Sequence, residues 1–211
     1  TGFTGGLVAA YLAEHGPETL RWAIAGRSLT KLEEVRGTLA RIAKRFATLP
    51  IIEASADDPA SLTKMAAQTR VVLTTVGPYA LFGEPLLAAC VEAGTDYVDI
   101  TGEPQFVDHS VATYDARAKE KRIRIVHCCG FDSIPHDLGA YFTARQLPSD
   151  APMTVRGFVR SRGTFSGGTW HSALNAFADI GASMKRKGSG KKKGDKTAET
   201  KDKRVVEGLP M

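Results

Sequence analysis

The sequence predicts an α/β fold, a doubly wound parallel sheet with helices on both of its faces. Short apolar segments alternate five times with amphipathic helical segments between residues 20 and 130, and the connections are short. Within the helical segments, such as residues 30–46, apolar side chains recur at helical spacing. This alternation is typical of parallel strands joined by right-handed helical crossovers.

Turn and cap residues mark where the elements begin and end. Asp58 followed by Pro59 is typical of a helix start, because Asp caps the first turn and proline fits the first helical position. Gly94 is typical of a helix end. Strands are expected at residues 22–25, 49–54, 71–75, 96–100 and 123–128. The stripe expected to be buried in the first helix is Leu7, Val8, Tyr11 and Leu12.

A glycine-rich turn opens the chain and runs directly into the first helix. Gly2 and Gly5 have the spacing of the last two glycines in a G-x-x-G-x-x-G dinucleotide-binding turn. Such glycines let the backbone approach a pyrophosphate, which binds the free N–H groups of the helix N-terminus. A helix cap without a ligand is the alternative. The predicted cofactor-binding residues of this turn are Thr1, Gly2, Phe3, Thr4 and Gly5.

The strand and the first glycine of this motif are absent from the sequence. We therefore interpret the chain as a fragment that begins within the motif. With the first strand restored, the alternation predicts a six-stranded Rossmann-type sheet.

The residue after the second strand of such a sheet selects between NAD and NADP. This position holds Arg27, followed by Ser28. A guanidinium suits a ribose 2′-phosphate through paired, charge-assisted hydrogen bonds, so the sequence predicts NADP(H) as the cofactor. The alternative is a solvated arginine ahead of a helix.

Two further loops follow predicted strands, at the carboxyl edge where open parallel sheets bind their ligands. Asp57 is a candidate partner of the adenine amino group, although capping of the next helix explains it equally well. Val76, Gly77 and Pro78 are expected near the nicotinamide ribose, since glycine leaves room there and proline stiffens the turn. An ordinary strand-to-helix turn is the alternative.

Composition excludes several classes of protein. The 211 residues are 43% hydrophobic and 24% charged, as in ordinary globular domains, and no apolar run reaches the roughly 18 residues of a spanning helix. The three cysteines give neither a disulfide framework nor metal-ligand spacing. We therefore expect a cytoplasmic protein without a metal site.

The net charge of +5 comes from one segment. Residues 185–204 hold ten Lys or Arg and three Asp or Glu, whereas the rest of the chain holds 18 basic and 20 acidic residues. We expect a solvated, disordered insertion over residues 185–211, with peripheral contact to an anionic membrane as the alternative. No aromatic residue interleaves the lysines for base stacking, so no specific nucleic-acid partner is expected.

The chain is expected to contain two folded parts ahead of that segment. Residues 1–148 form the predicted cofactor-binding domain, and residues 149–184 the start of a second, α+β substrate domain. Met153, Val155 and Val159 alternate with polar residues there, which predicts a half-exposed strand.

Several short motifs carry a more specific signal. They are Thr1-Gly2-Phe3-Thr4-Gly5, Gly77-Pro78-Tyr79, Asp96-Tyr97-Val98-Asp99 with Gly102-Glu103, Gly130-Phe131-Asp132-Ser133-Ile134-Pro135 with Asp137-Leu138-Gly139, and Ser166-Gly167-Gly168-Thr169. Together they resemble the saccharopine dehydrogenase-like oxidoreductase family, most closely its trans-acting enoyl reductase branch, which is associated with lipid and glycolipid synthesis. The resemblance extends to about Met184. His136 departs from it, since a small polar residue is expected there.

The resemblance implies hydride transfer from NADPH to an activated C=C bond of a lipid-like acyl or polyketide substrate. Backbone N–H groups from Gly130 onward would hold the cofactor or stabilise the enolate. Candidates for the proton donor are Asp132, Ser133, His136 and Tyr79. His127, on a buried strand, is expected to be a core residue with its hydrogen bonds satisfied.

Two other functions stay open at this point. One is a saccharopine dehydrogenase-type oxidoreductase acting on an amino acid. The other is an NADP-binding protein without turnover that associates with a membrane or lipid surface through its basic segment.

Overall fold

The computed structural model describes residues 1–148, 152–160 and 162. The predicted helix after Trp170 and the Lys-rich segment 185–211 lie outside the described residues, so the expectations for them stay predictions. Residues 152–160 do not form the predicted strand, and all of them are exposed. Among the described residues, they pair with no strand. An alternating pattern favours a half-exposed strand only where a neighbouring strand is available for pairing.

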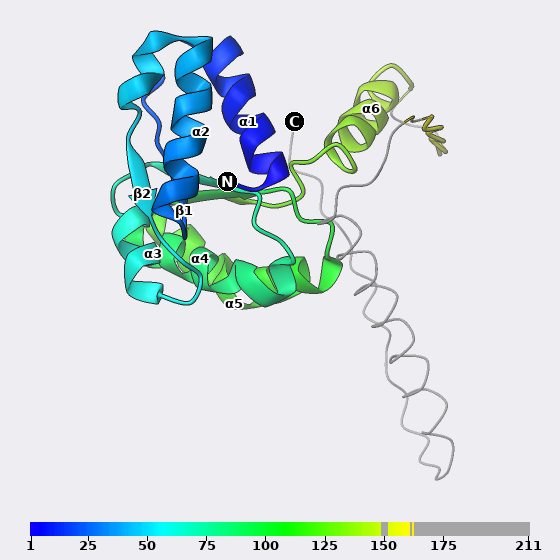
Figure 1. The fold of residues 1–211 in the computed structure, drawn as a ribbon. Helices are drawn as coiled ribbons and strands as arrows, with labels where there is room; N and C mark the ends of the chain where they lie inside the picture. Colours follow the sequence, from blue (N-terminus) through cyan, green and yellow to red (C-terminus); the bar gives the residue numbers. More distant parts are fainter. Residues whose placement is uncertain (149–151, 161, 163–211) are drawn as a thin grey trace, which may run out of the picture. The chain divides into compact units, whose positions relative to one another are not determined.

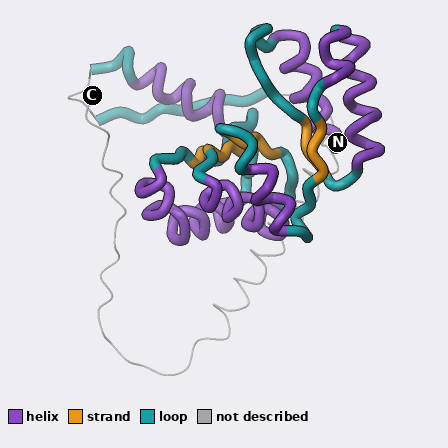
Figure 2. The backbone as a smooth tube through the Cα atoms, turned by 90° about the vertical axis from the view of Figure 1, so that its left-hand side faces the viewer, coloured by secondary structure: helices purple, strands orange, loops and turns teal. Residues whose placement is uncertain are grey.

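The α/β fold class is confirmed, because helices alternate with strands whose pairings are all parallel. The strands form two sheets, however, which Figure 2 shows as separate groups. One sheet has the order β1-β2 and the other the order β3-β4-β5. The single sheet that we predicted counted a strand ahead of Thr1, and no described strand joins β1 to β3. The strands are β1 (Ile24–Gly26), β2 (Ile51–Glu53), β3 (Val71–Thr74), β4 (Asp96–Asp99) and β5 (Ile125–Val126).

Helices cover both faces of these sheets, with α1 and α2 on one side and α3, α4 and α5 on the other (Figure 1). The helix α6 follows β5 and buries none of its side chains. The helices are α1 (Phe3–His15), α2 (Leu29–Ile42), the 3-10 helix η1 (Lys44–Thr48), α3 (Pro59–Ala66), α4 (Tyr79–Ala93), α5 (Pro104–Lys121) and α6 (Ile134–Ala144).

The caps read from the sequence fix several of these boundaries. The Asp58 carboxylate accepts hydrogen bonds from the N–H groups of Ala60 (3.1 Å) and Ser61 (3.2 Å), so it caps α3 as predicted. Gly94 ends α4 in the left-handed conformation, with a φ of 73°. The N-cap of α2 is Ser28, whose hydroxyl accepts from the N–H of Lys31 at 3.4 Å.

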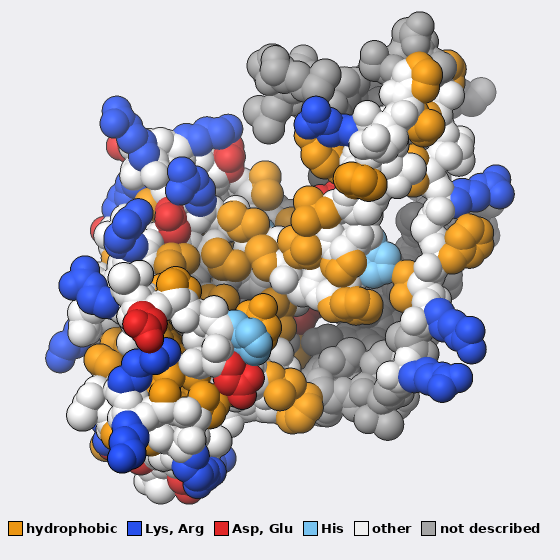
Figure 3. Space-filling view, turned by 90° about the horizontal axis from the view of Figure 1, so that it is seen from above, with side chains coloured by type: hydrophobic (Ala, Val, Ile, Leu, Met, Phe, Trp, Pro, Cys, Tyr) orange, Lys and Arg blue, Asp and Glu red, His pale blue; other side chains and the backbone are white. Residues whose placement is uncertain are grey.

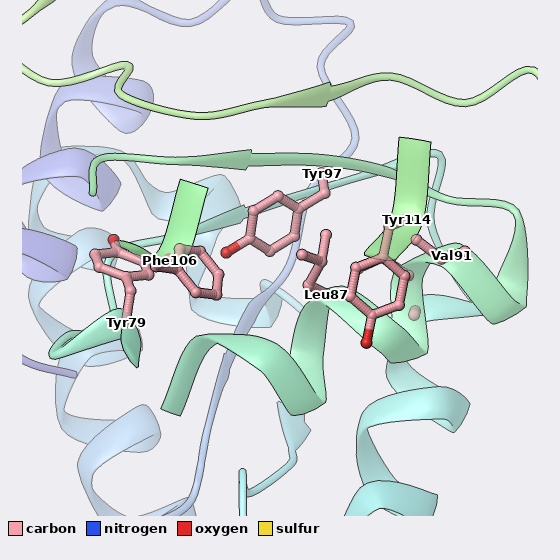
Figure 4. Close-up of a cluster of buried hydrophobic side chains, with 8 residues drawn as sticks. Tyr79, Leu87, Val91, Tyr97, Phe106 and Tyr114 are labelled. Carbon is pink, nitrogen blue, oxygen red and sulfur yellow. The ribbon is translucent and has the colours of Figure 1, made fainter. Parts of the chain in front are cut away.

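The main core lies between the β3–β5 sheet and helices α4 and α5 (Figure 4). Aromatic rings fill much of this core, because α5 presents Phe106 and Tyr114 to the side chains of α4 and β4. Its buried members are Ala66, Tyr79, Leu87, Cys90, Val91, Tyr97, Phe106 and Tyr114.

The buried stripe predicted for α1 is wrong at two of its four positions, since Val8 and Leu12 are half-buried. Leu7 and Tyr11 are exposed, whereas Ala9 and Ala13 pack into the core beneath α2. Apolar residues surround α1 on several sides, so periodicity alone does not select the buried side. Small side chains lie inward because they let the helix approach α2 closely.

Large apolar side chains are exposed on α1 and α6. Figure 3 shows hydrophobic side chains gathered in the middle of the face seen from above, with Lys and Arg toward its margins. In the described part of the chain, no helix is long and apolar enough to cross a membrane. The exposed apolar side chains of these two helices include Phe3, Leu7, Tyr11, Leu138, Tyr141 and Phe142.

Candidate functional site

In the described part of the chain, no side chain caps the N-terminus of α1. Gly2 is the N-cap, and the first turn contains no acidic residue. A β-carbon at Gly2 would meet no described atom within 4 Å, so the space beside Gly2 is open. The first N–H groups of a helix have no partner within the helix and favour an anion. These features fit a pyrophosphate.

The helix α1 reaches the carboxyl ends of strands from both sheets. A β-carbon at Gly5 would lie 3.2 Å from the hydroxyl oxygen of Thr75, directly after β3. A β-carbon at Gly26, the last residue of β1, would lie 3.7 Å from the side chain of Thr1. The predicted glycine turn therefore lies where the ends of β1 and β3 converge.

Arg27 and Ser28 follow β1 at this edge. Arg27 is exposed, and no described residue forms a hydrogen bond or ion pair with its guanidinium. Ser28 is half-buried and caps α2. Asp57 is exposed after β2, and Asp58 caps α3 instead, so capping does not account for the Asp57 carboxylate.

Glu103, a residue that we did not predict to belong to the site, holds the end of the turn from Val76 to Pro78. The Gly77–Pro78 peptide bond is cis, and α4 begins directly after it. The Glu103 carboxylate accepts hydrogen bonds from the N–H groups of Tyr79 (3.0 Å) and Ala80 (2.8 Å). Glu103 therefore caps α4 from the loop after β4. Its presence in a recognised motif was the only signal in the sequence.

Tyr79 lies in the core and not in an open site. The residue is 5% exposed, and its hydroxyl donates to the carbonyl oxygen of Thr74 at 3.1 Å. The N–H of Ile100 donates to the same hydroxyl at 3.4 Å. Burial raises the pKa of Tyr79 well above its usual value. This environment favours a structural role over proton donation.

Asp132 lies beside the loop after β4, and Ser133 follows it at the start of α6. A β-carbon at Gly102 or at Gly130 would lie 2.9 Å from an Asp132 carboxylate oxygen, so both glycines make room for this side chain. Ser133 is the N-cap of α6, yet its hydroxyl does not cap that helix. Burial raises the pKa of the nearby Cys128 thiol, and the Ser133 hydroxyl lowers it by a smaller amount.

His136 lies further along α6. It is exposed, and its ring stacks edge-on against Phe131 with the ring centroids 5.9 Å apart. The structure thus brings Asp132 to the loop after β4 and Ser133 to the start of α6, whereas Tyr79 is enclosed in the core.

Behind the loops lies a buried chain of hydrogen bonds. His127 Nδ1 contacts the Asp99 carboxylate at 2.6 Å, and His127 Nε2 contacts the Ser110 hydroxyl at 2.8 Å. The prediction that His127 is a core residue with satisfied hydrogen bonds is confirmed. No group of three or more His, Cys, Asp or Glu among the described residues has a metal-binding arrangement.

Comparison with known protein families matches residues 1–126 to the NADP-binding domain of saccharopine dehydrogenase. The chain belongs to this family. Its cofactor is accordingly NADP(H), which fits the uncapped N-terminus of α1 and the exposed guanidinium of Arg27.

Relatives of this NADP-binding domain include mycobacterial proteins named as trans-acting enoyl reductases. The chain is 46% identical over 182 residues to one such protein of Mycobacterium tuberculosis, covering 84% of the chain and 42% of that protein. It is 47% identical over 150 residues to a trans-acting enoyl reductase of Mycobacterium bovis, covering 71% and 35%. The chain thus spans less than half the length of these relatives.

A solved structure shares the fold. Apo saccharopine dehydrogenase (L-Glu forming) from Saccharomyces cerevisiae superposes with a TM-score of 0.52 at 19% sequence identity. The match covers 69% of this chain and 29% of the yeast chain.

Proposed function

We propose that this NADP-binding domain serves the NADPH-dependent reduction of an activated C=C bond in a lipid- or polyketide-type acyl substrate. One observation carries the proposal: the start of the chain lies beside Gly26, the last residue of β1, and Gly5 of α1 lies beside Thr75, which directly follows β3. Open parallel sheets bind dinucleotides at this carboxyl edge. The names of the mycobacterial relatives support the reaction type.

Each part of the edge has a role in holding the cofactor. The N–H groups of Phe3, Thr4 and Gly5 would bind the pyrophosphate at the start of α1. Arg27 would pair with the 2′-phosphate. The remaining cofactor candidates would line the adenine and nicotinamide ends, and these are Thr1, Ser28, Asp57, Val76, Gly77, Pro78 and Gly130.

NADPH supplies a hydride to the β-carbon of the substrate when bound. Negative charge then collects on the substrate carbonyl, where backbone N–H groups after Gly130 would stabilise it. A side chain must also protonate the α-carbon. We propose Asp132 or Ser133 for this step, since Asp132 lies beside the loop after β4 and the Ser133 hydroxyl does not cap α6, with His136 as a further candidate. Tyr79, enclosed in the core, would position the turn before α4.

Turnover with an α,β-unsaturated acyl thioester tests the reaction. We expect NADPH absorbance to fall and mass spectrometry to detect the saturated acyl product. Reduction of NADP⁺ with saccharopine and no reaction with the thioester would instead establish an amino-acid oxidoreductase. NADPH binding without consumption on either substrate would identify a binding protein without turnover.

Arg27→Ala should remove the preference for NADPH over NADH. The variant loses the charge-assisted hydrogen bonds to the 2′-phosphate, so we expect NADPH affinity to fall about tenfold, equivalent to about 1.4 kcal/mol. Affinity for NADH, which lacks this phosphate, should not change. Fluorescence titration of both nucleotides measures the two dissociation constants.

Arg21→Ala is the matched control. Arg21 is also an exposed arginine, but it precedes β1, whereas Arg27 follows β1 at its carboxyl end. It should bind both nucleotides like the unmodified chain. Equal losses of NADPH and NADH affinity in Arg27→Ala would contradict the role of Arg27.

A further inference from the structure

Asp99 is a buried carboxylate that joins two loops of the carboxyl edge. It is 0% exposed at the end of β4. One carboxylate oxygen accepts hydrogen bonds from the N–H groups of Thr101 and Cys128, each at 3.1 Å. The backbone carbonyl of Asp99 also accepts from the N–H of Cys129 at 2.8 Å. Asp99 therefore ties the loop after β4 to the loop after β5.

The second Asp99 oxygen is held from behind by His127. A carboxylate only accepts hydrogen bonds, so the His127 Nδ1 at 2.6 Å carries the proton. Nε2 then accepts from the hydroxyl of Ser110, 2.8 Å away on α5. The chain Ser110–His127–Asp99 thus fixes the orientation of the carboxylate.

The same three residue types form the triads of serine hydrolases, and Ser110 and His127 line a hollow of about 370 Å³ beside β5. Ser110, however, is only 2% exposed and lies in the middle of α5. Backbone N–H groups there are used within the helix and cannot form an oxyanion hole. The arrangement therefore holds Asp99 in place and does not supply a nucleophile.

The effect of Asp99 extends to a third loop. The hydroxyl of Thr101 accepts from the N–H of Glu103 at 3.1 Å, and Glu103 in turn caps α4 after the Gly77–Pro78 turn. On the other side, Asp99 holds Cys128, which has a φ of 61°. A non-glycine residue in this left-handed region is uncommon and needs support from its surroundings.

We propose that Asp99, oriented by His127 and Ser110, is a positioning residue for the nicotinamide half of NADPH. This inference rests on the proposed function. With Arg27 at the end of β1, the adenine half lies over the β1–β2 sheet, and the other half extends across the ends of β3, β4 and β5. The three loops that Asp99 connects lie at those ends.

Two ligands separate this role from general structural damage. NADPH contacts both halves of the site, whereas adenosine 2′,5′-bisphosphate contacts only the adenine half. In the 211-residue chain, Asp99→Ala should weaken NADPH about tenfold and the bisphosphate less than about twofold. Asp99→Asn keeps an oxygen for Thr101 and Cys128, so it should restore NADPH affinity to within about threefold of the original. Arg27→Ala should weaken both ligands.

Circular dichroism shows which variants fold. If Asp99→Ala is unfolded, His127→Gln replaces it, and the same selective loss of NADPH affinity is expected. Unchanged NADPH affinity in the folded variant overturns the proposal, and so do equal losses for both ligands. If the unmodified chain binds neither ligand, the proposed function itself fails. If the unmodified chain binds both ligands and only the expected effect of Asp99→Ala is missing, the positioning role of Asp99 fails and the proposed function stands.

Discussion

Gly2→Val should weaken NADPH binding strongly while leaving the fold intact. Gly2 has a φ of −77° and a ψ of 171°, a conformation that any residue adopts, and a β-carbon there meets no atom within 4 Å. Neither the backbone nor internal packing therefore requires glycine. A valine side chain would occupy space beside the α1 N–H groups, where we propose that the pyrophosphate binds. We expect a loss of roughly 100-fold in NADPH affinity, or about 2.7 kcal/mol, by fluorescence titration.

Gly37→Val is the matched control, since Gly37 is exposed in the middle of α2 and a β-carbon there also meets no atom within 4 Å. Valine and glycine have similar helix propensities, so its stability should change by less than about 0.5 kcal/mol and its NADPH affinity not at all. Normal NADPH binding by Gly2→Val would contradict a pyrophosphate site at the start of α1. A loss of binding explained by a lower melting temperature of the variant would contradict it as well.

For α1, the sequence predicts the start of the helix correctly but not the side of the helix that is buried. The glycine spacing predicted the uncapped helix N-terminus, because local geometry depends on neighbouring residues. The buried side of the same helix was predicted wrongly, since Leu7 and Tyr11 are exposed and Ala9 and Ala13 are buried. Which side lies inward depends on how closely α2 approaches, and this distance is a property of the tertiary structure.

Leu87→Ala should destabilise the chain by about 2–5 kcal/mol. Leu87 is 0% exposed, in the core that α4 forms with β4 and α5 (Figure 4). Truncation removes buried apolar surface and leaves a cavity among Val91, Tyr97 and Phe106, which are held by their own packing. Alanine favours the helix at least as well as leucine, so the loss reflects packing alone. Urea unfolding followed by circular dichroism measures it as a lower midpoint.

The control lies on the same helix. Leu81 is 65% exposed, so Leu81→Ala should change the free energy of unfolding by less than about 0.5 kcal/mol. Equal effects of the two substitutions would show that α4 does not pack as described. An unchanged midpoint in Leu87→Ala would lead to the same conclusion.

Some residues of the site could be predicted from local sequence patterns, and others could not because their partners lie far away in the sequence. Arg27, Asp57 and the turn at Gly77 could be placed from the sequence, because each follows a strand that the apolar pattern reveals. Glu103 and Asp99 could not be assigned their roles. The Glu103 carboxylate caps a helix that begins 24 residues earlier, and Asp99 accepts from an N–H 29 residues later. Single-sequence patterns contain no information on such pairings.

Ser110 is the clearest example. On the sequence it is one serine in an amphipathic helix, and its hydrogen bond to His127 appears only when α5 lies against β5. The division into two sheets was not foreseen either, since strand periodicity predicts which segments are strands but not which edges pair.

Heteronuclear NMR of the chain, titrated with NADPH, tests most directly whether the carboxyl edge is the cofactor site. We expect the backbone amides of Gly5, Arg27, Gly77 and Gly130 to shift on binding. The amides of Gly94 and Arg122, which end α4 and α5 just before β4 and β5, should not shift. Shifts confined to Gly94 and Arg122, or no shifts at saturating NADPH, would contradict a cofactor site at the carboxyl edge.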